Sequence, residues 1–311
     1  RDLRMSRGLG DVYKRQANDL GIRIIGDIPI YVAFDGADSW SHPELFQFDE
    51  NSTPLAVAGC PPDAFAATGQ LWGNPLYDWP RHKAEDFAWW KRRMQHATSI
   101  YDVVRIDHFR GFESYYAIPA GNKTAAGGHW EKGPDRAFIN AIHETLGQGG
   151  IIAEDLGYLT PEVKTMLAAS GYPGMKIMQF AFDSREPGNY LPYTYPHNSV
   201  VYTGTHDNET IKGWYASITA QERKLARDYL CDSCTPASRL HMSFISLIMR
   251  SQARMCIIPL QDYMGLDNDC RINTPSTVGT NWRWRLLPGQ MSDPLVKTIS
   301  SVTLRYGRWN W

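Results

Sequence analysis

Short apolar runs alternate with longer stretches of helical periodicity along most of this chain. Runs rich in Ile, Val, Tyr and Met and bounded by Gly, Pro, Asn or Asp are typical of buried strands. Such runs predict strands at residues 22–28, 102–107, 150–154, 176–182, 199–205 and 255–260. An apolar period of about 3.6 residues predicts helices between them, at residues 84–98, 135–146, 161–170, 219–229 and 238–251, and a last amphipathic helix in 294–311. Strands that alternate with helices favour a parallel α/β sheet.

An acidic residue follows or closes nearly every predicted strand. These residues are Asp27, Asp107, Glu154, Asp183, Asp207 and Asp262. An open doubly wound sheet gathers ligand groups at one switch point, whereas a barrel presents them around the rim at the C-terminal ends of its strands. The pattern therefore predicts a (β/α)8 TIM barrel. Such a barrel has eight strands, so we expect the first two to be missing before residue 21.

The predicted domain organisation is a single barrel with an insertion. Residues 1–16 are basic and lack a clear period, and we expect them to be a non-native leader before a catalytic barrel at 17–311. Residues 31–81 are too many for a simple loop between barrel strands, which predicts an inserted subdomain and active-site loop. Its part at 58–79 is dense in Gly, Pro and aromatic residues, which favours fixed turns over a substrate.

The composition limits the kinds of partner and the cellular location that we expect for this protein. The 311 residues are 43% hydrophobic with a formal net charge of -1 and no basic patch, which argues against a nucleic-acid partner. No apolar run reaches the ~18 residues of a membrane span, so we expect a soluble protein. The odd number of cysteines favours a reducing cytoplasm. The lone Cys231–Cys234 pair lacks the further ligands that a zinc site needs.

Two of the acidic residues are suited to glycosidic chemistry. Retaining cleavage needs a carboxylate nucleophile and a protonated carboxylic acid ~5 Å apart. Arg105 lies two residues before Asp107 on the same strand face and is expected to keep this carboxylate ionised. Glu154 follows an apolar run and precedes Asp155, so burial and like charge are expected to raise its pKa. Asp207, after His206, would accept hydrogen bonds from sugar hydroxyls.

Structural roles compete with these functional ones. Any single carboxylate after a buried strand could simply cap the next helix. His108 and His206 could be structural histidines, and Trp72 could belong to the core. A metal cluster of these histidines with Asp107 and Asp207 is less favoured, because neighbouring residues alternate between strand faces.

The motifs occur together and in a fixed order. They are GDIPIYVAFDGAD (26–38), GCPPDAFAATGQLWGNPLYDW (59–79), VVRIDHFRGF (103–112), IIAEDLG (151–157), VYTGTHDNET (201–210) and NTPSTVGTNWRWR (273–285). In this order and spacing the sequence closely resembles the 4-α-glucanotransferase family, also called amylomaltase or disproportionating enzyme, over residues 20–308.

The resemblance implies a (β/α)8 barrel of the α-amylase-like type that acts on α-1,4-glucans without a cofactor or metal. It implies a glucan donor and a glucose or maltooligosaccharide acceptor. By motif position Asp107 resembles the family nucleophile, Glu154 the acid/base and Asp207 the transition-state stabiliser. The residues expected to bind sugar are Asp27, Arg105, His108, His206 and Asn273, with Asp63, Gln70 and Trp72 in the covering loop and Asp183 at the rim.

Two alternatives remain open at this point. An α-glucan hydrolase or branching enzyme of the amylase group would share the Asp, Glu, Asp order but would not be expected to carry the loop GCPPDAFAATGQLWG at 59–73. A non-catalytic glucan-binding barrel remnant is the other, because a barrel without its first strands has unpaired sheet edges.

Overall fold

The computed structural model describes residues 12–62, 67–157, 159–183 and 190–309. The chain folds as two units, Arg1–Gly174 and Met175–Trp311, hereafter unit 1 and unit 2. Each of the six predicted apolar runs overlaps a strand in these units, although several of the strands are shorter than predicted. None of the helices in the described ranges is both long enough and apolar enough to cross a membrane.

A parallel sheet forms the centre of unit 1. Its strands β1 (Ile25–Pro29), β4 (Val103–Asp107) and β7 (Ile151–Ala153) lie side by side. In this register Asp27 is the partner of Arg105, so the two side chains leave neighbouring strands on the same face. The close approach of Gly26 to Tyr101 requires glycine there, since an added Cβ would lie 2.0 Å from the tyrosine ring.

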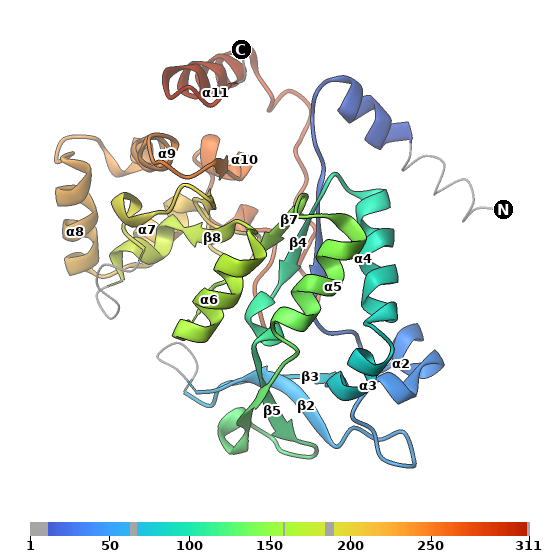
Figure 1. Ribbon diagram of the computed structural model, residues 1–311. Helices are drawn as coiled ribbons and strands as arrows, with labels where there is room; N and C mark the ends of the chain where they lie inside the picture. Colours follow the sequence, from blue (N-terminus) through green and yellow to red (C-terminus); the bar gives the residue numbers. More distant parts are fainter. Residues whose placement is uncertain (1–11, 63–66, 158, 184–189, 310–311) are drawn as a thin grey trace. The chain divides into compact units, whose positions relative to one another are not determined.

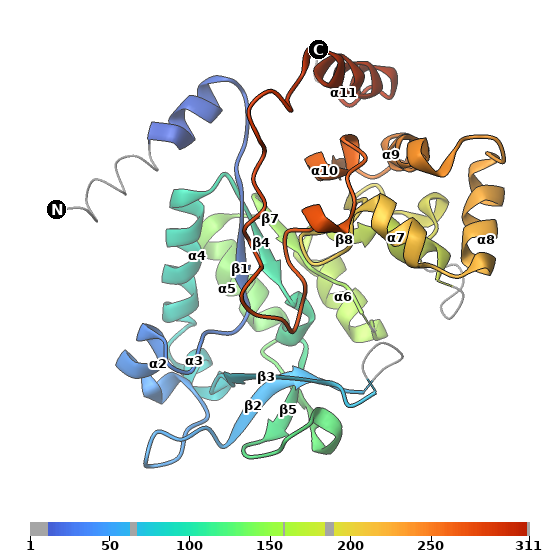
Figure 2. The same cartoon turned by 180° about the vertical axis from the view of Figure 1, so that it is seen from behind.

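Helices cover this sheet through apolar faces. α4 (Ala88–Ile100) and α5 (Arg136–Leu146) lie next to each other, as Figures 1 and 2 show. α6 (Pro161–Ser170) has the predicted bounds, because Thr160 caps its N-terminus, with its hydroxyl accepting from the Val163 amide, and Gly171 ends it in a left-handed conformation. A shorter helix, α3 (Trp79–Ala84), precedes α4.

Aromatic side chains make up much of the unit 1 core. Trp90 of α4 is fully buried, with ring centroids 5.1 Å from Phe112 and 5.3 Å from Phe138. The Phe112 and Phe138 rings stack at 3.9 Å. The helices are therefore fixed to the strands by edge and face contacts between large rings, which stabilise beyond the area that they bury.

A second, antiparallel sheet lies in the same unit. Its strand order is β3 (Gln70–Pro75), β2 (Ala56–Cys60), β5 (Ser114–Pro119), β6 (His129–Lys132). Two of the strands come from residues 31–81, where the sequence predicts an inserted subdomain, and two from residues that follow β4. A short helix, α2 (Ala37–Ser41), belongs to the same region.

Residues 12–19 form a helix whose polar side chains contact the turn before β4. Lys14 Nζ and Asn18 Nδ2 donate to the Asp102 carboxylate at 3.0 and 2.8 Å, and the Ile24 amide donates at 2.7 Å. These donors lower the pKa of Asp102 to about 2. Part of the predicted leader thus belongs to an ordered helix, while residues 1–11 lie outside the described residues. Its non-native origin stays a prediction.

Unit 2 contains the parallel strands β9 (Ser199–Tyr202) and β10 (Met255–Ile257). Its helices are α7 (Ile211–Ser217), α8 (Ala220–Leu230), α9 (His241–Met249), α10 (Leu260–Tyr263) and α11 (Asp293–Arg305). A reciprocal capping box between Thr219 and Glu222 begins α8.

The strand predicted at 176–182 is wrong from Met178 onward. β8 spans Gly174–Ile177, and the chain then forms a 3-10 helix, η4 (Met178–Phe182). Met178, Ala181 and Phe182 stay buried in this turn. The centroid of the Phe182 ring lies 5.7 Å from that of Tyr229 and 6.0 Å from that of Phe244. A short apolar run does not by itself distinguish a buried strand from a buried helical turn.

The aromatic core of unit 1 can be tested with two tryptophans. Trp90→Ala removes a fully buried ring and should lower the free energy of unfolding by about 3–5 kcal/mol. Trp40→Ala removes a ring that is 84% exposed on α2 and should change it by less than about 0.5 kcal/mol. Urea unfolding followed by fluorescence measures both, and equal effects would contradict this assignment of the core.

Candidate active site

Arg105 lies between two carboxylates at the C-terminal end of the unit 1 sheet. Its residue exposure is 8%, and its guanidinium donates to Asp27 Oδ2 at 2.5 Å and to Asp107 Oδ1 at 2.7 Å. The register of β1 and β4 places all three side chains on one face. A buried guanidinium is tolerated only where anions compensate it, so the two carboxylates are held in place around it.

Glu154 is the first residue after β7, the strand next to β4, and it is also buried, at 8% exposure. Its Oε2 accepts a hydrogen bond from the His108 amide at 2.7 Å, and its Oε1 accepts one from the Leu156 amide at 2.8 Å. Burial and the Asp107 charge together raise the pKa of Glu154 to about 7, against the opposing effects of Arg105 and the two amides. A carboxyl group with this pKa exchanges its proton near neutral pH, as general acid/base catalysis requires.

The backbone conformation of His108 makes this arrangement possible. His108 has φ 55° and ψ 45°, in the left-handed region that residues other than glycine seldom adopt. The chain turns there directly after β4, and the amide of His108 meets Glu154. Strained residues of this kind cluster at functional sites, where surrounding contacts hold them.

The His108 ring is neutral and has capacity for a ligand. Burial lowers its pKa to about 3, with a smaller contribution from Arg110. Its Nε2 is buried and has no hydrogen-bond partner within the described parts of the chain. A neutral imidazole nitrogen can form one hydrogen bond with a hydroxyl group, which a sugar could supply here only by displacing the side chains that bury it.

The β2–β3 hairpin brings Trp72 to the same place. The Trp72 ring meets the His108 ring edge to face at 4.8 Å and lies 6.3 Å from the Tyr31 ring. Trp72 Nε1 donates to Gln70 Oε1 at 3.0 Å, and the Trp72 side chain remains 36% exposed. Two of the loop residues expected to cover the substrate are therefore joined to the carboxylate site of unit 1. The third, Asp63, lies outside the described residues.

A second polar group in unit 2 surrounds Asp207. Asn273 Nδ2 donates to Asp207 Oδ1 at 2.5 Å, and His206 Nε2 lies 3.3 Å from Asp207 Oδ2. Arg271 ties the segment together by donating to the backbone carbonyls of Asp207, at 2.5 Å, and Asn273, at 2.8 Å. The Trp282 ring lies 5.1 Å from the His206 ring and is 56% exposed.

Three residues of these groups are missing from the sequence-based set: Tyr31, Arg271 and Trp282. Tyr31 and Trp282 lie inside the 26–38 and 273–285 motifs, and Arg271 is two residues before Asn273. Motif membership was therefore a usable signal for the two aromatic residues.

Two other acidic residues have different surroundings. Asp262 is buried and accepts from Thr203 Oγ1 at 2.5 Å and from the Ile211 amide at the start of α7 at 2.8 Å. Its pKa is raised to about 6 by burial, and its role is to fix a helix end. Asp262 therefore holds the start of α7, and its place among the carboxylates of the rim stays a prediction. Asp183 ends the 3-10 helix η4 and not a strand, and its place in the sugar-binding set stays a prediction.

Within the described ranges, no three His, Cys, Asp or Glu side chains are grouped so that they could hold a metal ion.

Comparison with known proteins assigns the chain to a family. The family model described as 4-alpha-glucanotransferase matches residues 8–290. The chain belongs to the 4-alpha-glucanotransferase family. This confirms the resemblance that the motifs carry.

Individual relatives agree with this assignment. The chain is 47% identical over 298 residues to a 4-alpha-glucanotransferase of Synechocystis, covering 95% of this chain and 59% of the relative. It is 46% identical over 284 residues to one of Thermus thermophilus, covering 90% of this chain and 57% of the relative. The chain thus spans less than two thirds of the length of these family members.

Solved structures agree as well. An amylomaltase from Streptococcus agalactiae in complex with acarbose matches with a TM-score of 0.92 and 39% identity, covering 97% of this chain and 61% of that one. An amylomaltase from Corynebacterium glutamicum matches with a TM-score of 0.79 at 19% identity, covering 96% and 48%, which speaks for the fold alone. The predicted (β/α)8 fold class of the α-amylase-like type is confirmed by this likeness.

The burial of Glu154 predicts a pH dependence of stability. Its pKa is about 7 when folded and near 4.5 in an unfolded chain, so the folded state binds the proton more tightly between these values. The free energy of unfolding should therefore fall as pH rises from about 4.5 to 7, by on the order of 3 kcal/mol from this residue.

The Glu154→Gln variant isolates this contribution because it does not titrate. The difference in unfolding free energy, wild type minus variant, should decline from pH 4.5 to 7 and then level off. Urea unfolding at several pH values measures it, and a difference that does not vary with pH would disprove the assigned pKa.

Proposed function

We propose that this chain carries the catalytic chemistry of a 4-α-glucanotransferase. It would transfer α-1,4-glucan segments from a maltooligosaccharide or starch-type donor to glucose or another maltooligosaccharide. The observation that supports this most is the pairing of Glu154, with a pKa of about 7, with the Arg105-bound carboxylate of Asp107. One carboxyl group able to donate a proton beside another held by a guanidinium is the arrangement that retaining glycosidic chemistry uses.

The proposed reaction is a double displacement. Asp107 attacks the anomeric carbon while Glu154 gives its proton to the departing glycosidic oxygen, which leaves a glycosyl-enzyme ester and an ionised Glu154. An acceptor hydroxyl then attacks the same carbon, Glu154 takes its proton, and the Asp107 carboxylate is released. From the family resemblance we also assign to Asp207, which Asn273 and His206 contact within unit 2, the role of transition-state stabiliser.

Residues around Asp107 are proposed to bind the sugar. Asp27 and Arg105 would bond hydroxyl groups at the C-terminal end of the sheet, and His108 would use its unpaired Nε2. The exposed face of Trp72 suits the apolar face of a glucose ring. Because Trp72 packs on His108, it is also placed to limit the access of water to the glycosyl-enzyme.

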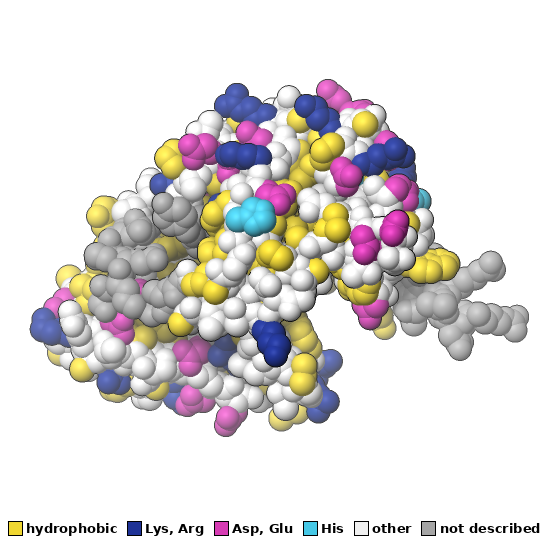
Figure 3. All heavy atoms as spheres, turned by 90° about the horizontal axis from the view of Figure 1, so that it is seen from below, with side chains coloured by type: hydrophobic (Ala, Val, Ile, Leu, Met, Phe, Trp, Pro, Cys, Tyr) yellow, Lys and Arg dark blue, Asp and Glu magenta, His cyan; other side chains and the backbone are white. Residues whose placement is uncertain are grey.

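The surface and the cysteines fit a neutral substrate and a cytoplasmic location, which we include in the proposal. Figure 3 shows acidic and basic side chains interspersed among apolar ones on the face that it draws, without a concentration of one sign among the described residues there. None of the five cysteines, all within the described ranges, forms a disulfide. Such a surface is unlike the basic patches that bind polyanions, and free thiols are usual in reducing compartments.

Product analysis with maltotriose tests the function. The chain should form glucose together with a ladder of longer glucans. Glu154→Gln should lower the rate about 10²- to 10⁴-fold, and Asp107→Asn should remove the covalent step. Glu50→Gln, an exposed carboxylate in a loop, is the matched control and should leave the rate unchanged. Glucose and maltose without longer products would indicate a hydrolase instead, and glucan binding without products would indicate a binding protein.

The role of Trp72 gives a separate prediction. Trp72→Ala should raise the ratio of hydrolysis to transfer several-fold, because water would reach the glycosyl-enzyme more easily. Leu71→Ala is the control, since Leu71 is 40% exposed and adjacent residues of a strand face opposite sides. Chromatography of the products against maltotriose concentration measures the ratio. The same ratio in both variants would refute a shielding role for Trp72.

A further inference from the structure

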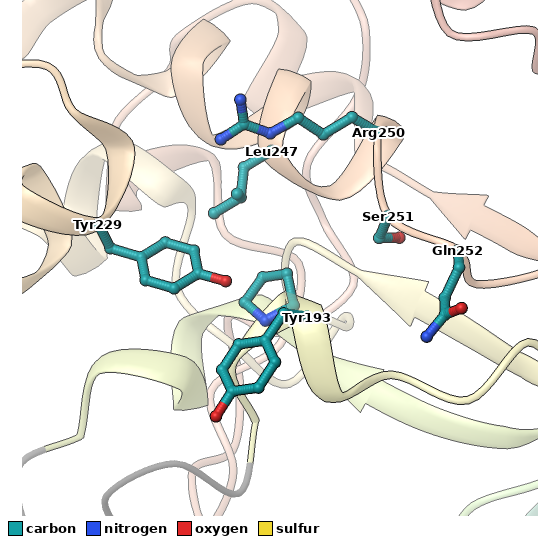
Figure 4. A pocket seen from close by; sticks show the side chains of 7 residues that line it. Tyr193, Tyr229, Leu247, Arg250, Ser251 and Gln252 are labelled. Atoms are coloured by element: carbon teal, nitrogen blue, oxygen red, sulfur yellow. The ribbon is translucent and has the colours of Figure 1, made fainter.

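An open cavity of about 440 Å³ lies on unit 2, between α8, α9 and the short turn η5 (Pro192–Thr194). Figure 4 shows Tyr229 of α8, Leu247 of α9 and Tyr193 of η5 around it, with Arg250 and Gln252 from the segment that follows α9. Its volume falls in the range of small-molecule sites, ~300–1,000 Å³.

This cavity lies apart from the Asp207 group. Residues 250–252 lead into the N-terminal end of β10, and residues 192–194 precede the N-terminal end of β9. His206 and Asp207 instead follow the C-terminal end of β9, and the two strands run parallel. The cavity and Asp207 are therefore at opposite ends of this strand pair, and the proposed reaction does not use the cavity.

The cavity has an aromatic wall that is open to a ligand. The Tyr193 side chain is 71% exposed, and Tyr229 turns its hydroxyl toward the middle of the group (Figure 4). Leu247 closes the base beside them. Tyrosines offer an apolar ring for the C–H face of a sugar and a hydroxyl for its polar edge.

Polar groups around this wall are available for hydrogen bonds. In the part of the chain that the structure describes, neither the exposed guanidinium of Arg250 nor the hydroxyls of Tyr193 and Tyr229 have a hydrogen-bond partner. Gln252 is held in place, since its Nε2 donates to the Tyr195 carbonyl at 2.6 Å. A guanidinium with five donors and a fixed amide are suited to a ligand with many hydroxyl oxygens.

A second hollow shares Arg250 with the first. It measures about 290 Å³. The further wall includes Asp232 and Ser243, which are joined by a hydrogen bond of 3.0 Å. Among the described residues that line the two hollows, Arg250 is the one cation, and Asp232 is a carboxylate on the further wall. That balance favours an uncharged polyhydroxyl chain over an anion.

We propose that this groove, defined by Tyr193, Tyr229, Arg250 and Asp232, is a second binding site for an α-1,4-glucan chain. It holds part of a long glucan at a place distinct from the reacting bond, which raises the local concentration of polymeric substrate. The identity of the ligand rests on the proposed function, whereas the presence of the groove does not.

Affinity electrophoresis through gels that contain glycogen tests the groove. The protein carries Glu154→Gln so that the polymer is not consumed during the run. Adding Tyr193→Ala or Arg250→Ala should weaken the affinity for glycogen about 3- to 10-fold. Tyr193→Phe keeps the ring and should lose less than Tyr193→Ala. Trp40→Ala, which removes an exposed ring from unit 1, is the control and should not change the affinity.

The outcomes separate the groove from the catalytic assignment. With Glu154 intact, the Tyr193→Ala variant should disproportionate maltotriose at the wild-type rate. Its catalytic efficiency should fall only with long glucans as substrate. The second site would be overturned if both groove variants kept the glycogen affinity of the Glu154→Gln protein, or if the Glu154→Gln protein itself were not retained by glycogen. A ladder of products from maltotriose would still support the proposed function in either case. Retention that depends on Tyr193 without any ladder would uphold the groove and reject the transferase.

Discussion

The buried guanidinium of Arg105 is the interaction on which the candidate site depends. It is charged at every physiological pH and nearly excluded from water, so it requires anions on both sides. Asp27 from β1 and Asp107 from β4 supply them at 2.5 and 2.7 Å. A slip of one residue between these strands would turn one carboxylate to the other face. The ion pairs therefore fix the register, and the register fixes the position of the proposed nucleophile.

Glu154 differs from Asp107 through its surroundings and not through its own chemistry. Two backbone amides hold its oxygens, which would by themselves favour the ionised form, but burial and the Asp107 charge outweigh them and leave a pKa of about 7. One of those amides belongs to His108, which adopts a left-handed conformation directly after the last residue of β4. Strand end, strained turn and acid/base are thus parts of one arrangement in unit 1.

Much of this was predictable from the sequence, because the barrel strands are short apolar runs that end in acidic residues. The strands that carry Asp107 and Glu154, and helix α6 with its Thr160 cap and Gly171 end, are confirmed. The antiparallel sheet was not predicted. Two of its strands, β3 (Gln70–Pro75) and β6 (His129–Lys132), are largely exposed and lack an apolar run. Asp262 shows why an acidic residue after a predicted strand is not enough to identify a catalytic group. An aspartate at such a position can also bond the amide at the start of a helix, as Asp262 does for Ile211.

The positions of side chains relative to each other could not be predicted from the sequence. The contact of Trp72 with His108, and the support of Asp207 by Asn273, join residues that are tens of positions apart.

The most direct test of the account is the pKa of Glu154, measured by NMR titration of its side-chain carboxyl carbon in the folded chain. The account predicts a midpoint at about 7. A midpoint near 4.5, the value for a solvated glutamate, would contradict its assignment as the acid/base.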